Sequence, residues 1–164
     1  MSSETIFFII VVFLCLDFVL ERILESLNSK HMSPVLLDSL KGIYDEKEYS
    51  RFQSYKRENG RLDSWSSGVG FVVMIVFLVA GGFGWYNSWV VSLTDSVVWQ
   101  TILFVVGLSV VSSVLDIPFD YYATFRIEEK YGFNKTTRRV YWLDTVKELV
   151  LSLVLGGVLL ALVV

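Results

Sequence analysis

The stretch Phe125-Arg126-Ile127-Glu128-Glu129-Lys130-Tyr131-Gly132-Phe133-Asn134-Lys135 is polar, aromatic and densely charged. It lies between two strongly apolar segments, residues 97–117 and 146–164. A helix rises about 1.5 Å per residue, so roughly 20 residues cross a hydrocarbon core of about 30 Å. The stretch is therefore expected to connect two membrane-spanning helices.

Two more apolar segments precede this pair, at about residues 4–27 and 65–86. Trp65 and Trp85 at the ends of the latter are typical interfacial anchors. The chain is 54% hydrophobic, with a mean hydropathy of +0.56. Strand signals are few, so the pattern predicts one all-α membrane domain, residues 1–164. It is polytopic, with four transmembrane helices (about 4–27, 65–86, 97–117 and 146–164) and cytoplasmic helical connections.

The polar first connection carries several local signals. Ser33-Pro34 favours a helix start and Gly42 a stop, while Asp45-x-x-Glu48 resembles a capping box that opens a second helix. Asn59-Gly60 is a break signal. Whether this helix breaks there or continues into the membrane stays open at this point.

The basic residues fall on one side of the predicted membrane. All 14 lysines and arginines lie in two groups, Arg22–Arg61 and Arg126–Lys147. With four spans, the first and third connections share a side, and the positive-inside rule makes that side cytoplasmic. The N-terminus is expected outside, or in the lumen of a eukaryotic compartment.

The motif and its flank resemble the signature of the type I CAAX prenyl proteases, a family of integral-membrane zinc metalloendopeptidases. The matching positions are Phe125, Ile127, Glu128, Glu129, Tyr131, Gly132, Phe133, Asn134, Lys135, Thr137, Asp144 and Lys147. In that family, membrane helices enclose a hydrated chamber whose zinc site faces inward near the cytosolic end. The resemblance therefore implies the membrane N-terminal portion of such an enzyme.

The zinc chemistry of that family needs a His-Glu-x-x-His sequence, in which two imidazoles one helical turn apart bind the metal. The chain contains one histidine, His31. We therefore expect no cofactor and no catalysis from these residues alone, with zinc bound in a missing C-terminal portion. The other expected partners are the lipid bilayer and prenylated or other peptides. Because basic and acidic residues interleave, a nucleic-acid partner is not expected.

The resemblance also implies roles for individual residues. Asn134, Lys135, Arg138 and Arg139 are candidates for the substrate cleft, unless the phrase only packs the cytosolic connection. Gly132 suits a left-handed turn, and Asn134 could cap the next helix. Structural roles are expected for Glu128, Glu129, Gly132, Phe133, Asp144 and Lys147. For the two glutamates, salt bridges with Arg126, Lys130, Arg138 or Arg139 are favoured.

Four polar residues fall within the predicted spans. Ser112, Asp116 and Asp120 lie four apart and form one helical stripe, which in lipid must face protein or water. Asp17 either reaches the headgroups or faces a cavity. The resemblance makes all four candidates for the chamber wall. An alternative is a stand-alone four-helix scaffold or small transporter that uses Asp17 and Asp116 for proton coupling.

The charge asymmetry makes a testable prediction about topology. In a Cys15→Ala background, single cysteines at Lys47 and Lys135 should be shielded from an impermeant thiol reagent added to intact cells. A cysteine at Asn87 should be labelled. Labelling at Lys135 without labelling at Asn87 would reverse the orientation.

Overall fold

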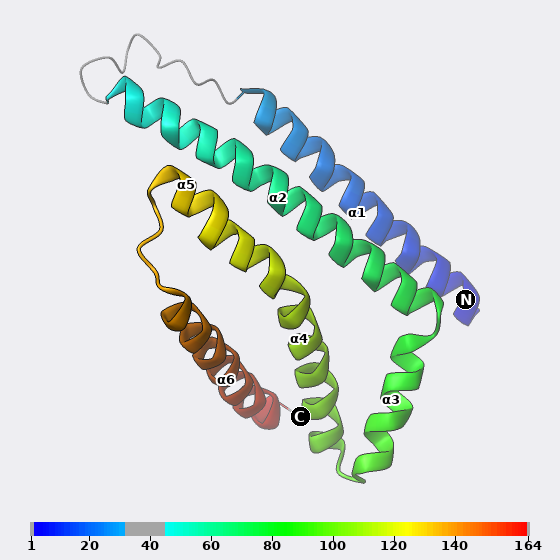
Figure 1. Ribbon diagram of the computed structural model, residues 1–164. Coiled ribbons are helices and arrows are strands. Elements are labelled where there is room, and N and C mark those ends of the chain that lie inside the picture. The colour runs from blue at the N-terminus through cyan, green and yellow to red at the C-terminus, as the bar shows by residue number, and fades with distance from the viewer. Residues whose placement is uncertain (1, 32–44, 164) are drawn as a thin grey trace. The chain divides into compact units, whose positions relative to one another are not determined.

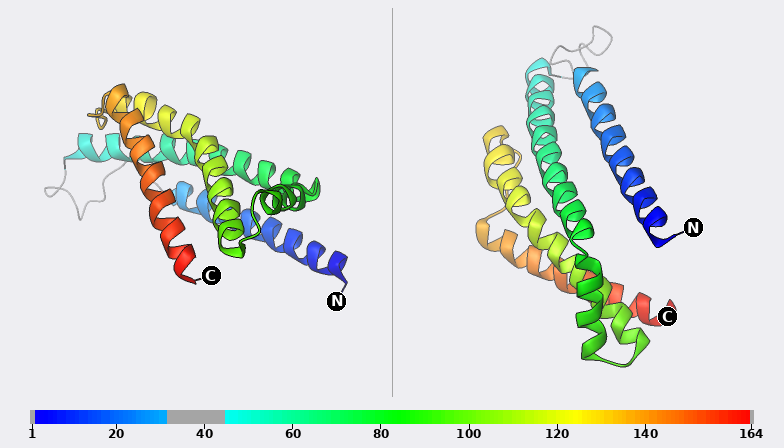
Figure 2. Two further views of the ribbon diagram at one scale, coloured as in Figure 1. Left: turned by 90° about the horizontal axis from the view of Figure 1, so that it is seen from below. Right: turned by 90° about the vertical axis from the view of Figure 1, so that its right-hand side faces the viewer.

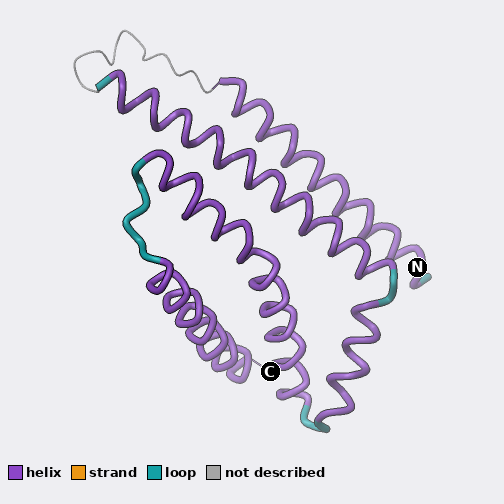
Figure 3. The backbone as a smooth tube through the Cα atoms, in the orientation of Figure 1, coloured by secondary structure: helices purple, strands orange, loops and turns teal. Residues whose placement is uncertain are grey.

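The computed structural model describes residues 2–31 and 45–163, and the described chain is helical apart from short connections (Figure 3). The elements, in order along the chain (Figure 1), are α1 (Ser3–His31), α2 (Glu46–Val79), α3 (Gly82–Leu93), α4 (Val97–Tyr122), a π-helix (Ala123–Glu128), α5 (Glu129–Tyr131) and α6 (Arg138–Val163). The expected helix start at Ser33-Pro34 and stop at Gly42 lie outside the described residues.

The helices are those of a membrane protein. Three helical stretches among the described residues are long and apolar enough to cross a bilayer: α2, α6 and the continuous run Val97–Tyr131. Their large apolar side chains point outward, with Trp65 74% and Leu162 78% exposed. Outward-facing apolar side chains are what lipid contact requires. The prediction of an all-α polytopic membrane protein is confirmed.

The chain forms two compact units. The first comprises residues 1–71 and 122–134, and the second comprises residues 72–121 and 135–164. Within the first unit, α1 lies alongside α2 (Figure 2, right). The rings of Phe18 and Phe71 stack there with centroids 4.1 Å apart.

Helix α2 begins where the capping signal predicted and continues through the possible break. The Asp45 carboxylate oxygen Oδ1 accepts hydrogen bonds from the backbone N–H groups of Lys47 (2.7 Å) and Glu48 (3.1 Å). Asn59-Gly60 lies inside the helix. A long helix tolerates one glycine at a cost of about 1 kcal/mol relative to alanine, so the local signal does not stop it.

The predicted span 65–86 does not end where expected. Helix α2 stops at Val79, and Gly81 takes a left-handed conformation with φ 71° before α3 begins. Residues 87–93, expected to be a connection, belong to α3. Hydropathy did not predict this break, because the sequence is apolar on both sides of it and hydropathy alone does not indicate where a helix ends.

Helix α3 packs against α4 in the second unit. The Tyr86 hydroxyl donates to the Leu103 carbonyl at 2.7 Å, and the Tyr86 and Phe104 rings lie 5.2 Å apart. A Cβ atom at Gly107 would collide with the Tyr86 hydroxyl. The absence of a side chain at Gly107 therefore permits this close approach.

The last two predicted spans are longer than expected. Pro118, expected just beyond its span, lies inside α4, and helical structure continues through the π-helix and α5. Proline supplies no N–H, but one missing hydrogen bond does not end so long a helix. Helix α6 starts at Arg138 rather than near residue 146.

The contact at Gly107 generates a prediction. Gly107→Ala should lower the thermal stability of the detergent-purified protein by about 1–3 kcal/mol, because the new methyl group displaces Tyr86 and its hydrogen bond. The matched control is Gly156→Ala, where an added Cβ meets no atom within 4 Å. Equal thermal unfolding of the two variants would contradict the packing role of Gly107.

Candidate functional site

The signature segment folds into a helix end of defined geometry. After the π-helix and α5, Gly132 takes φ 72° and ψ 20°. The Phe133 N–H donates to the Glu128 carbonyl at 2.8 Å, and the Gly132 N–H donates to the Glu129 carbonyl at 3.1 Å. These two bonds make a Schellman cap, in which a left-handed residue satisfies the last carbonyls of a helix. The left-handed turn predicted at Gly132 is confirmed.

Polar contacts join this segment to the first half of α2 within the same unit. Glu58 receives two of them, from the Lys130 ammonium at 2.6 Å and from the Tyr131 hydroxyl at 2.8 Å. The Tyr55 hydroxyl lies 3.5 Å from the Glu128 carboxylate. Residues more than 70 positions apart in sequence are thereby held together.

Aromatic contacts reinforce the junction. The Tyr55 ring lies 5.0 Å from that of Phe133 and 6.0 Å from that of Tyr131, both edge to face. The Arg51 guanidinium is 5.2 Å from the centre of the Phe133 ring, within cation–π range. Phe133 is thus held from two sides although 38% of its surface is exposed.

Among the ion pairs of the described residues, none includes Glu128 or Glu129, although the sequence predicted salt bridges for both. Lys130 pairs instead with Glu58, which sequence reasoning missed. The only available signal was the spacing of Arg51, Tyr55 and Glu58 on one face of α2. Glu58 lies before the apolar part of α2, and its pKa is lowered chiefly by hydrogen bonds from Lys130 and Tyr131.

The predicted cleft residues follow Gly132. Lys135, Arg138 and Arg139 are exposed, and Asn134 is half-buried. The backbone N–H of Asn134 donates to the Glu128 carbonyl at 3.3 Å, so this residue completes the turn.

The expectation that Asn134 caps the next helix is wrong. Thr137, the residue before α6, accepts the Val140 N–H at 3.3 Å through its hydroxyl. Helix α6 begins at Arg138, four residues after Asn134, so Asn134 is too far from its first turn to cap it. Further along α6, Asp144 and Lys147 form an exposed ion pair at 3.3 Å.

A polar cavity of about 360 Å³ lies between α4 and α6 in the second unit. Asp116 and Asp120 line it, as do Ser109 and Ser113 from the same helix. The Tyr141 hydroxyl, also in its wall, donates to the Ile117 carbonyl at 3.4 Å. The cavity is large enough to hold water beside these carboxylates, although half of its lining residues are apolar.

Two of the predicted intramembrane residues lie elsewhere. Ser112 is exposed and is not part of the cavity wall, and Asp17 is exposed on α1. Sequence reasoning missed the polar contribution of α6: Tyr141, Thr145, Glu148 and Ser152. Their spacing of three or four residues is helical, but the helix was expected to begin only near residue 146.

The residues present do not form a zinc site. Among the described residues, no three potential histidine, cysteine or carboxylate ligands converge. Glu128 and Glu129 are adjacent in a helical segment, and adjacent positions point to different faces. No chemical step through a metal is derived from these residues.

Comparison with known proteins gives consistent relatives. The family model for the CAAX prenyl protease N-terminal region, described as having five membrane helices, matches residues 25–164. The "Probable CAAX prenyl protease 1" of Schizosaccharomyces pombe is 34% identical over 134 residues, which cover 73% of this chain and 27% of that protein. The "CAAX prenyl protease 1" of Saccharomyces cerevisiae is 28% identical, covering 84% of this chain and 32% of that protein.

A solved structure is similar as well. The crystal structure of S. mikatae Ste24p superposes with a TM-score of 0.81 at 29% identity, covering 95% of this chain and 38% of that chain. The chain therefore spans between about a quarter and two fifths of the length of these relatives.

The Schellman cap makes Gly132 a sensitive position. Gly132→Ala should destabilise the protein by about 1–2 kcal/mol, measured by thermal unfolding in detergent, because an L-residue is strained at this positive φ. An added Cβ meets no atom within 4 Å, so the cost is conformational. Gly132→Asn should cost less, and Gly60→Ala, in a regular helix, should stabilise. A neutral Gly132→Ala would contradict the assigned conformation.

Proposed function

The chain belongs to the CAAX prenyl protease N-terminal family, and from this membership we propose that it forms the membrane part of a zinc metalloendopeptidase. In this proposal, the zinc ligands and the catalytic glutamate come from a C-terminal metalloprotease portion. The residues of this chain position the peptide and build part of the chamber around it.

The observation that carries the proposal is the family match over residues 25–164, which includes the whole signature segment. The relatives named as CAAX prenyl proteases are similar over 73% and 84% of this chain. Family membership favours this function over a stand-alone scaffold or transporter.

We assign the cations after Gly132 to substrate binding. Lys135, Arg138 and Arg139 are exposed and lie close together in sequence beyond a rigid turn. Charge-assisted hydrogen bonds from arginine to a carboxylate are short and directional. This cluster is suited to the free carboxylate at the C-terminus of a peptide, with the Asn134 side chain near the peptide backbone.

The polar wall of the α4–α6 cavity is assigned to the chamber. Asp116, Asp120 and Glu148 place carboxylates in one cavity together with serine hydroxyls. Carboxylates within a membrane-spanning helix are costly unless water or partners solvate them, so this cavity favours a hydrated interior. Asp17 and Ser112 remain candidates for the same wall in the complete protein.

The orientation follows from the charge distribution. All 14 basic residues lie in the first and third connections or at the adjoining ends of the spans, so we propose that both connections face the cytoplasm and the N-terminus lies outside or in the lumen. The turn at Gly132 then lies on the cytoplasmic side, where the family places its peptide cleft.

The proposal is tested on the complete protein in detergent. Arg138→Gln/Arg139→Gln should raise the KM for a prenylated peptide with a free C-terminal carboxylate by about tenfold or more, since two charge-assisted hydrogen bonds are lost. The kcat should change little, and cleavage of the C-terminal amide of the same peptide should be unaffected. Lys47→Gln/Lys56→Gln, which removes the same charge from α2, serves as the control.

The outcomes separate the parts of the proposal. An equal rise in KM for the amide substrate would show that Arg138 and Arg139 do not bind the C-terminal carboxylate. An unchanged KM for both substrates would remove the cleft assignment. Absence of zinc-dependent hydrolysis by the complete wild-type protein would overturn the proposed function itself.

A further inference from the structure

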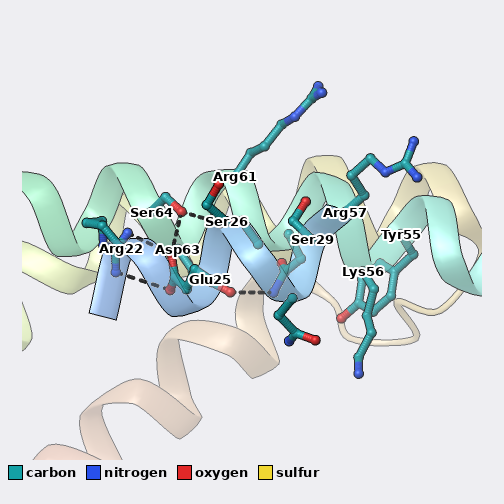
Figure 4. Close-up of a pocket in the computed structure, with 13 residues that line it drawn as sticks. Arg22, Glu25, Ser26, Ser29, Tyr55, Lys56, Arg57, Arg61, Asp63 and Ser64 are labelled. Atoms are coloured by element: carbon teal, nitrogen blue, oxygen red, sulfur yellow. Dashed lines mark hydrogen bonds and ion pairs between the residues drawn. The ribbon is translucent and has the colours of Figure 1, made fainter. Parts of the chain in front are cut away.

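A polar groove of about 540 Å³ lies between α1 and the first half of α2, within the first unit (Figure 4). It shares no lining residue with the α4–α6 cavity and shares only Tyr55 with the contacts of the signature segment. The proposed function makes no use of it. Its wall consists of Arg22, Glu25, Ser26, Asn28, Ser29, Tyr55, Lys56, Arg57, Asn59, Gly60, Arg61, Asp63 and Ser64. All of these positions are polar or glycine.

The groove carries an excess of positive charge. Four of its side chains are cationic (Arg22, Lys56, Arg57 and Arg61), against the two carboxylates of Glu25 and Asp63. Arg57 and Arg61, one turn apart on α2, extend to the same side in Figure 4. Such a pair presents several N–H donors in a geometry that matches phosphate oxygens.

The two carboxylates already have donors inside the groove. The Glu25 carboxylate pairs with the Arg22 guanidinium at 2.9 Å. It also accepts a hydrogen bond from the Ser64 hydroxyl at 2.8 Å. Asp63 accepts from the Asn59 amide at 3.3 Å. Arg22 compensates Glu25, so three further cations share the groove wall with the single carboxylate of Asp63 and the wall keeps a net positive charge.

The groove lies at the depth of lipid headgroups. Ser64, in its wall, directly precedes Trp65, which is 74% exposed at the start of the apolar part of α2. Exposed tryptophan at such a junction is typical of the membrane–water interface. On α1, the apolar residues Val19 and Ile23 are also about half exposed, at 51% and 49%.

A second, shallow hollow of about 350 Å³ lies along α1 and adjoins the first. It is lined by Val19, Arg22, Ile23, Ser26, Leu27 and Lys30, and shares Arg22 and Ser26 with the polar groove. A polar recess with basic walls therefore lies beside a strip of α1 that exposes the apolar side chains of Val19, Ile23 and Leu27. That sequence of surfaces matches an amphiphile with an anionic head and a hydrocarbon tail.

We propose that the α1–α2 groove binds an anionic phospholipid, with its phosphate headgroup at Arg57 and Arg61 and an acyl chain along Val19, Ile23 and Leu27. The exposed apolar side chains beside the recess favour a phospholipid over a soluble phosphate compound, which would leave them in contact with water. Each basic residue near an anionic membrane surface contributes substantially to such binding. The site would operate whether or not the complete protein hydrolyses peptides.

The test uses the complete protein purified in detergent and titrated with phosphatidylserine or phosphatidylcholine, with bound lipid counted by native mass spectrometry. Wild type should bind phosphatidylserine in preference to phosphatidylcholine. Arg57→Gln/Arg61→Gln should bind phosphatidylserine at least about tenfold more weakly, through the loss of two cationic contacts. Lys47→Gln/Lys147→Gln removes the same charge outside the groove and the adjoining hollow and should bind like wild type.

A second variant fills the groove without changing its charge. An added Cβ at Gly60 meets no atom within 4 Å, so Gly60→Leu should be accepted by the helix, for which leucine is the better former. Its side chain should occupy the groove and lower phosphatidylserine binding. Equal affinity for the two lipids, wild-type binding by both groove variants, or an equal loss in the Lys47/Lys147 control would each overturn the proposal.

Discussion

A backbone N–H or C=O group in hydrocarbon has no water to bond, and this constraint governs nearly every feature of the chain. Regular helices meet it for most of the described residues. The chain can change direction only where a turn satisfies its own polar groups. Among the described residues, Gly81 and Gly132 are the two glycines with positive φ, and each lies at such a turn. At Gly132 the two capping bonds satisfy the carbonyls that the preceding helix leaves open.

The same constraint explains how the signature segment is fixed. Its π-helix and Schellman cap satisfy the backbone locally, which leaves the side chains to make the long-range contacts. Lys130 and Tyr131 both converge on Glu58, and Tyr55 contacts Phe133 through its ring. The motif is therefore a rigid helix end fastened to α2.

Composition and periodicity were sufficient to predict the helical membrane class, the Asp45 cap and the left-handed turn at Gly132, because each depends on local chemistry. The end of α2 at Val79 was not predictable from hydropathy, since the residues on both sides of the break are equally apolar. The π-helix gives no compositional signal. Glu58 and Glu148 were missed because their importance depends on tertiary pairing or on a helix start that the sequence placed elsewhere.

The basic residues around the signature segment fall into two groups, those that contact other parts of the fold and those that are exposed. The Lys130 ammonium pairs with the Glu58 carboxylate at 2.6 Å, and the Arg51 guanidinium lies over the Phe133 ring. Both contacts hold the turn to α2. Lys135, Arg138 and Arg139 lie beyond the turn and are exposed. A cation that braces the fold cannot move to meet a ligand without loosening it, which is why the proposed substrate contacts are assigned to the three beyond the turn. In this proposal, the turn at Gly132 separates structural from ligand-directed charge within one short segment.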